Sequence, residues 1–133
     1  RLTASPALNE LTLTEGQHLP EGASLYVRAT SLWRVDGIAE NPSENTITVQ
    51  IQGVLPQVGG TLYHAVTQAE ATLYTASHDG SVRVPLQVSG GQPLEFFEPD
   101  ALALPVLTSG ERVQVQVPPH HCFIFADGMR HYL

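Results

Sequence analysis

The chain contains no lysine, and its six basic residues are all arginine, against thirteen acidic residues. A Walker-type phosphate-binding loop needs a lysine to reach the phosphates, so the chain cannot contain one. Schiff-base chemistry and serine–lysine nucleophile pairs are excluded for the same reason. The formal net charge of −7 also argues against binding to nucleic acid or to an anionic membrane surface, because both depend on neutralising phosphate charge.

Cysteine and long apolar runs are scarce as well. Cys122 is the only cysteine, so neither an internal disulfide nor a zinc-binding or redox-active cysteine pair can form. No apolar run approaches the roughly 20 residues of a membrane-spanning helix, and we expect no membrane insertion. The 133 residues suffice for one domain, and we expect a single all-β domain over residues 1–133, or two barrel-like halves. Because the sequence opens on Arg1 without a methionine, we expect it to be part of a larger or processed protein.

Apolar and polar residues alternate with a period of two along much of the chain, which is typical of half-buried strands. The pattern is clearest over residues 46–51, 81–88 and 112–117. Weaker versions predict further strands over residues 11–14, 24–29, 61–67 and 71–76. Residues 94–97 and 122–126 are short and more continuously apolar, so we expect these two strands to be buried on both faces.

Turn-forming residues separate these segments, and Gly59-Gly60 and Asp79-Gly80 are typical of hairpins. No segment has a convincing helical pattern. Residues 100–104, between Pro99 and Pro105, fit one helical turn or an extended crossover equally well. The sequence therefore predicts an all-β fold of one or two small OB-like or MOP-like β-barrels, with a β-sandwich as the alternative.

One cluster of histidine and cysteine is a candidate for metal chemistry. Neighbouring residues of a strand point to opposite faces, so His120 and His121 cannot easily share an ion, whereas His120 and Cys122 can. With His131, these two form the candidate metal set. A buried structural cysteine beside exposed histidines explains the same pattern more simply, and nothing around Cys122 resembles the nucleophile of a protease or transferase. We therefore expect no metal, no cofactor and no catalysis.

Two further groups of residues are candidates for ligand binding. Glu95 and Glu98 flank Phe96-Phe97, as on carbohydrate-binding surfaces or in glycosidase carboxylate pairs, although the aromatic pair also fits a strand end with its acids facing water. Trp33 is the only tryptophan and has the character of a core or interface anchor.

Two arginines of the same region are candidate anion ligands. Arg28 and Arg34 flank the segment that contains Trp33. We name Arg28, Trp33 and Arg34 as candidate ligand-binding residues. The alternative is that the arginines are solvated or salt-bridged, as is common in an acidic chain.

Two segments resemble parts of one known family. Residues 22–33 contain Val27-Arg28 and resemble the strand in which accessory domains of importer ATPases carry a Val-Arg-Pro-Glu motif, with Ala29-Thr30 in place of the Pro-Glu. Residues 109–128 resemble the closing strand pair of the same domains, in which an alternating strand after a glycine leads to a histidine and a phenylalanine. These are the TOBE, or MOP-like, C-terminal domains of ABC transporter ATPases.

The resemblance implies a pair of OB-like barrels that regulates transport. Its partners would be its own ATPase domain, encoded elsewhere in the full protein, and a second copy in a homodimer, with a dimer face that includes Trp33 or the Phe96-Phe97 corner. Such a domain is cytoplasmic and peripheral to the inner membrane. Some members bind oxyanions, but no ligand residue can be matched here. The alternative is a β-sandwich carbohydrate-binding or accessory module of a larger secreted enzyme.

Overall fold

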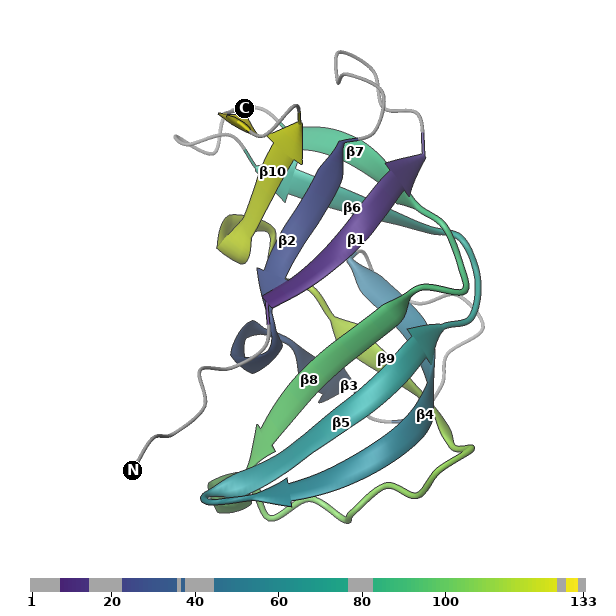
Figure 1. Ribbon diagram of the computed structural model, residues 1–133, viewed down its shortest axis with the longest axis vertical. Helices are drawn as coiled ribbons and strands as arrows, with labels where there is room; N and C mark the ends of the chain where they lie inside the picture. Colours follow the sequence, from purple (N-terminus) through teal and green to yellow (C-terminus); the bar gives the residue numbers. More distant parts are fainter. Residues whose placement is uncertain are drawn as a thin grey trace.

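The computed structural model describes residues 8–14, 23–35, 37, 45–76, 83–126 and 129–131. Within these residues the chain forms two antiparallel sheets, one above the other in Figure 1. The all-β prediction is confirmed. The described residues include no helix long and apolar enough to cross a membrane.

The six-stranded sheet has the order β11-β10-β2-β1-β7-β6. Its strands are β1 (Leu8–Thr14), β2 (Ser24–Arg28), β6 (Ala71–Ala76), β7 (Arg83–Val88), β10 (Cys122–Ala126) and β11 (Met129–His131). The five-stranded sheet has the order β3-β9-β4-β5-β8. Its strands are β3 (Trp33–Val35), β4 (Thr46–Gln57), β5 (Gly60–Thr67), β8 (Pro93–Pro99) and β9 (Arg112–Gln116). The chain therefore passes from one sheet to the other several times.

In the described part of the chain, three single 3-10 turns connect strands: η1 (Ala29–Ser31), η2 (Asp100–Leu102) and η3 (Pro119–His121). The segment after Pro99 combines both predicted possibilities, because the turn η2 is followed by an extended crossover.

The predicted hairpin at Gly59-Gly60 is confirmed, and both glycines have a steric reason. Gly59 has φ +85°, which L-residues with a side chain rarely adopt. A Cβ on Gly60 would lie 2.4 Å from the backbone oxygen of Glu98 and from the ring of Phe97. The pair allows β4 and β5 to turn tightly while β8 packs directly beside the start of β5.

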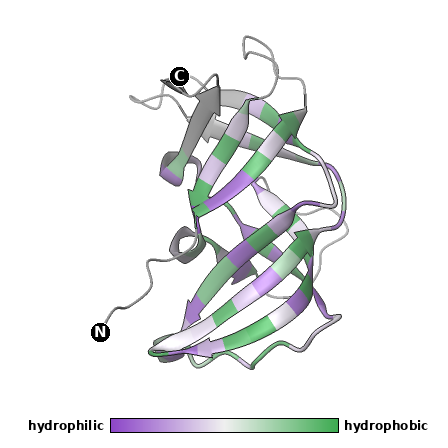
Figure 2. Cartoon of the chain, viewed as in Figure 1, coloured by the Kyte–Doolittle hydropathy of each residue, from purple (hydrophilic) through white to green (hydrophobic). Residues whose placement is uncertain are grey.

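Strand β8 differs from the prediction of burial on both faces. Its residues alternate, with Leu94 and Phe96 buried and Glu95 and Phe97 only partly covered. The reason is that one face of the sheet packs on the core and the other is partly open to solvent, as it is along β5. Figure 2 shows the same alternation of hydropathy along β4, β5 and β8. Cys122 is only partly buried, and for residues 123–126 the prediction concerns side chains outside the described set.

The buried side chains of both sheets form one hydrophobic cluster. Tyr63 and Phe96 lie in it, with ring centroids 5.0 Å apart. The Tyr63 hydroxyl oxygen accepts a hydrogen bond of 3.0 Å from the backbone N–H of Leu107. A buried phenol needs such a partner, and here the partner belongs to the crossover that follows β8.

Side-chain amides join the two sheets where main-chain ladders do not. The Asn9 amide of β1 pairs with the main chain of Glu95 in β8 through two hydrogen bonds of 2.7 Å. The Gln92 amide pairs with both main-chain groups of Thr12, at 2.6 and 3.1 Å. Asn45, just before β4, pairs with the main chain of Tyr74 in β6 through two bonds of 2.8 Å. Each amide thus satisfies a donor and an acceptor that a neighbouring strand would otherwise satisfy.

Candidate functional site

Arg34 lies in β3 at one edge of the five-stranded sheet and binds Glu98 in β8 at the other edge. Its Nε donates a hydrogen bond of 2.8 Å to one carboxylate oxygen of Glu98, and Nη2 donates to the other. Both side chains are nearly buried, with 11% and 7% exposed. The hydrogen bond to Glu98 is the main reason why the pKa of Arg34 is raised. This bidentate ion pair holds the edge strands β3 and β8 close to each other. The sheet therefore curls in the manner of a barrel.

The pairing bears on the predicted ligand-binding residues. A ligand anion at Arg34 would have to compete with Glu98 for the donors that the guanidinium already uses. Trp33 and Arg34 are neighbours in one strand, so their side chains point to opposite faces. Arg28 is exposed at the end of β2, in the other sheet. An anion site formed by these three residues stays a prediction.

Cys122 begins β10, and burial raises the pKa of its thiol to about 12. Its Sγ donates a hydrogen bond of 3.3 Å to the backbone oxygen of Pro118. The thiolate is the form that attacks substrates and binds metals, and here it is strongly disfavoured at neutral pH. No three His, Cys, Asp or Glu side chains gather to hold a metal ion in the part of the chain that the structure describes. The side chains of His120 and His131 lie outside that part.

The Phe96-Phe97 corner is not an exposed aromatic surface. Phe96 is fully buried in the core, so it cannot contact a sugar or a partner protein. Glu98 is paired with Arg34, and only Glu95 remains partly exposed. The simpler interpretation of the pair, as an anchor of the strand, fits this arrangement. Phe97 and Glu95 stay partly exposed on the other face of β8, and a carbohydrate-binding role for them stays a prediction.

A surface that was not predicted from the sequence lies at the end of the five-stranded sheet. Seven large apolar side chains are exposed among the described residues, and five of them lie in two segments. These five form what we call the apolar patch: Leu55, Val58, Leu102, Leu104 and Val106. The first two belong to the β4–β5 hairpin and the other three to the crossover of residues 100–107. Val58 is 96% exposed and Val106 65% exposed.

The two segments of the patch lie side by side. Gly60 pairs with Pro99 at the start of β5, and the backbone N–H of Asp100 donates a hydrogen bond of 2.9 Å to Gly59. In Figure 1 the crossover runs along the lower end of the molecule beneath the hairpin. Figure 2 shows that much of the crossover is hydrophobic. The continuous apolar run of residues 101–107 was the available sequence signal, but its exposure was not evident from it.

The crossover is held in place by hydrogen bonds at its beginning, middle and end. Besides the bond from Asp100, Nη2 of Arg34 donates to the backbone oxygen of Pro105 at 2.9 Å, and Leu107 donates to the Tyr63 hydroxyl. Ala103 has φ 52° and ψ 36°, in the left-handed region. That conformation costs an L-residue roughly 1–2 kcal/mol. The backbone is thus anchored, and strained at one residue, while the apolar side chains stay outside the core.

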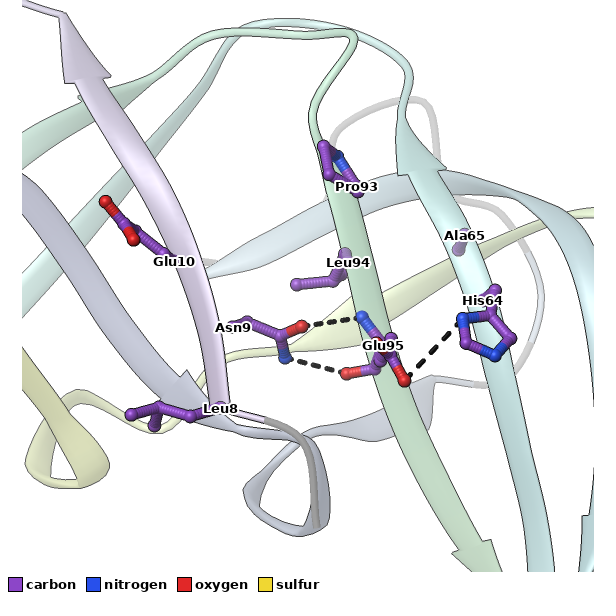
Figure 3. A pocket seen from close by; sticks show the side chains of 8 residues that line it. All are labelled: Leu8, Asn9, Glu10, His64, Ala65, Pro93, Leu94 and Glu95. Carbon is purple, nitrogen blue, oxygen red and sulfur yellow. Dashed lines mark hydrogen bonds and ion pairs between the residues drawn. The ribbon is translucent and has the colours of Figure 1, made fainter.

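A pocket of about 270 Å³ lies elsewhere, where β1 meets β5 and β8. Residues 8–10, 64–65 and 93–95 line it (Figure 3). His64 and Glu95 face each other across the β5–β8 ladder, with 3.6 Å between Nδ1 and a carboxylate oxygen. No local sequence pattern brings residues 64 and 95 together, so the sequence alone does not predict this pair.

No protein-family model and no curated protein matches the chain. The resemblance of residues 22–33 and 109–128 to TOBE domains therefore stays a hypothesis.

Proposed function

We propose that the chain is a non-catalytic accessory domain that docks onto a second copy of itself through the apolar patch. The observation that carries this proposal is that five exposed, large apolar side chains belong to two segments that meet at Gly59 and Asp100. Contiguous exposed apolar surface on a soluble chain marks an interaction site or an aggregation hazard. The anchored crossover favours the first, because a docking surface needs its side chains held in place before the partner arrives.

A second copy suits this surface in charge and in size. Asp100 is the only charged residue in residues 55–60 and 99–107, whereas the chain as a whole carries a net charge of −7. Two acidic chains therefore meet with the least repulsion at the patch. A stable dimer buries about 800 Å² on each partner around an apolar centre. The five large side chains, with the exposed alanines and prolines between them, would form that centre.

The larger protein is also a matter of proposal. The resemblance of two segments to TOBE, or MOP-like, domains supports an ABC importer ATPase as the parent, with this domain regulating transport in the cytoplasm beside the inner membrane. The two antiparallel sheets, one of them curled by the Arg34–Glu98 pair, are in keeping with OB-like barrels. The sequence of the full gene that encodes this chain tests the proposed parent protein. A nucleotide-binding domain on the same polypeptide supports it, and a hydrolase domain contradicts it.

Sedimentation of the isolated chain over a range of concentrations tests the docking step. We expect reversible dimerisation that strengthens as salt rises from low ionic strength to about 0.15 M, because salt screens the repulsion between the two chains. Burial of one valine is worth about 1.5–3 kcal/mol. Val58→Glu should therefore weaken dimerisation by at least roughly tenfold.

The matched control is Thr72→Glu, which adds the same charge to an exposed position in the six-stranded sheet. It should leave the dimer intact. Trp33→Ser tests whether the face extends to β3, as the sequence analysis predicted. A chain that stays monomeric up to about 1 mM at this salt concentration would refute self-docking, as would equal effects of the Val58 and Thr72 variants.

A further inference from the structure

The pocket between β1, β5 and β8 has a structural origin in the way the two sheets meet. Among the described residues, β1 pairs with β2 and β7, and no main-chain ladder joins it to β8. The Asn9 side chain spans the gap instead, with its amide bonded to both main-chain groups of Glu95. A ladder holds strands about 4.8 Å apart. An inserted side chain holds them farther apart, and the pocket lies beside that amide (Figure 3).

The pocket offers one accessible carboxylate beside an exposed proline. Leu94 and Ala65 line it but are nearly fully buried on the core face, whereas Pro93 and Glu95 lie on the opposite, partly open face of β8. The Glu95 carboxylate is 31% exposed and lies beside the His64 imidazole. Glu10 also lines the pocket, but its carboxylate accepts a hydrogen bond of 3.1 Å from Ser24. In Figure 3 that carboxylate points away from Glu95.

The lining residues of the pocket favour a cation over an anion. No arginine lines it, and the chain has no lysine, so no permanent positive charge faces the Glu95 carboxylate from the lining residues. An N–H donor that carries a positive charge forms the stronger kind of hydrogen bond with a carboxylate. The volume of about 270 Å³ is at the small end for ligand sites, which commonly span about 300–1,000 Å³. It suits a short chain with one charged end.

We propose that this pocket binds a small organic cation, namely an ammonium or guanidinium group on a short aliphatic chain. The charged end donates hydrogen bonds to the Glu95 carboxylate, and the aliphatic part packs on Pro93, which lies on the same face of β8. Because β1 belongs to one sheet and β5 and β8 to the other, the bound cation contacts both sheets at their seam. The inference does not depend on the apolar patch.

NMR titration of the ¹⁵N-labelled chain tests the proposal, with pentylammonium as the probe. A ligand of this size is expected to bind with a Kd on the order of 10 mM. The amide signals of Asn9, His64 and Glu95 should shift in a saturable manner. Pentanoate has a similar aliphatic body and the opposite charge, and it should bind at least roughly tenfold more weakly.

Two variants locate the charge contact. Glu95→Gln should weaken pentylammonium binding by about tenfold, since it removes the carboxylate and leaves the main-chain bonds to Asn9 in place. Glu70→Gln removes one negative charge from an exposed position between β5 and β6, and it should leave the affinity unchanged. Equal effects of the two variants, equal binding of pentanoate, or the absence of saturable shifts up to about 50 mM would overturn the proposal.

A third ligand distinguishes the two sources of such a cation. Nα-acetyl-lysine methylamide presents the same ammonium group on a peptide backbone. Binding as tight as that of pentylammonium would assign the pocket to a lysine side chain of another protein. Binding at least roughly tenfold weaker would assign it to a free small amine. Both results support the cation site and differ only in the source of the cation.

Discussion

Removal of the Arg34 guanidinium should destabilise the protein far more than removal of an exposed arginine. Arg34 donates to both oxygens of Glu98, and its Nη2 also donates to Pro105. In Arg34→Met the Glu98 carboxylate, only 7% exposed, would stay buried without its partner. Loss of one member of a buried pair costs about 3–5 kcal/mol. The backbone oxygen of Pro105 would lose a donor as well.

The assay is urea unfolding at pH 7, followed by tryptophan fluorescence and far-ultraviolet circular dichroism. Arg34→Met should lower the free energy of unfolding by about 3 kcal/mol or more. The control Arg112→Met removes an exposed arginine of β9, and it should change stability by less than about 0.5 kcal/mol. The double variant Arg34→Met, Glu98→Leu removes both charges. It should recover much of the loss, because replacing a buried pair with apolar residues is often neutral.

The result that would refute this reasoning is specific. If Arg34→Met costs no more than Arg112→Met, the ion pair does not hold β3 against β8. A double variant that is as unstable as the sum of both single variants would show that the two side chains do not interact. In either case the anchoring of the crossover through Pro105 would also lose its support, and with it one argument for a preorganised apolar patch.

Further predictions concern three other residues of the fold. Ala103→Gly should raise the free energy of unfolding by up to about 1 kcal/mol in the same urea assay, because glycine relieves the left-handed conformation, and a loss of stability would contradict this. The Cys122 thiol should react with iodoacetamide at pH 8 about a thousandfold more slowly in the folded than in the unfolded chain, because burial raises its pKa from 9.0 to about 12. The same shift predicts a stability contribution that is complete below pH 9 and is lost as the pH rises toward 12, so equal alkylation rates would contradict both statements. Asn45→Ala should lower the free energy of unfolding by about 3 kcal/mol or more, measured by thermal or urea unfolding. The reason is that the Asn45 side-chain amide forms hydrogen bonds with the main chain of Tyr74 and Val117 in the interior. Asn45→Asp keeps only the acceptor and should also be destabilising.

The strands were predictable from the sequence because their information is local. Alternation over residues 46–51 and 112–117 identified parts of β4 and β9, and the two glycines at 59 and 60 identified the hairpin between β4 and β5. A period of two and a φ above zero are properties of a few neighbouring residues. The absence of lysine excluded whole classes of chemistry by composition alone. None of these statements depends on which strands pair.

The tertiary structure decided which residues meet, and the reason is distance along the chain. Arg34 and Glu98 are 64 residues apart. The sequence around Arg34 did not indicate whether its guanidinium pairs with a buried carboxylate or binds a ligand. Phe96 and Phe97 are equivalent in sequence, but only the face that β8 turns toward the core decides that the first is buried.

The candidate sites depend on the same long-range packing. The apolar patch combines residues of a hairpin with residues of a crossover some forty positions later. In a different tertiary structure the apolar run of the crossover could have formed a buried strand. The pocket exists because Asn9 and Glu95, 86 residues apart, meet through a side-chain amide rather than a ladder. Local pattern therefore determined the strands and the excluded chemistries. The pairing of distant segments determined every surface to which a function can be assigned.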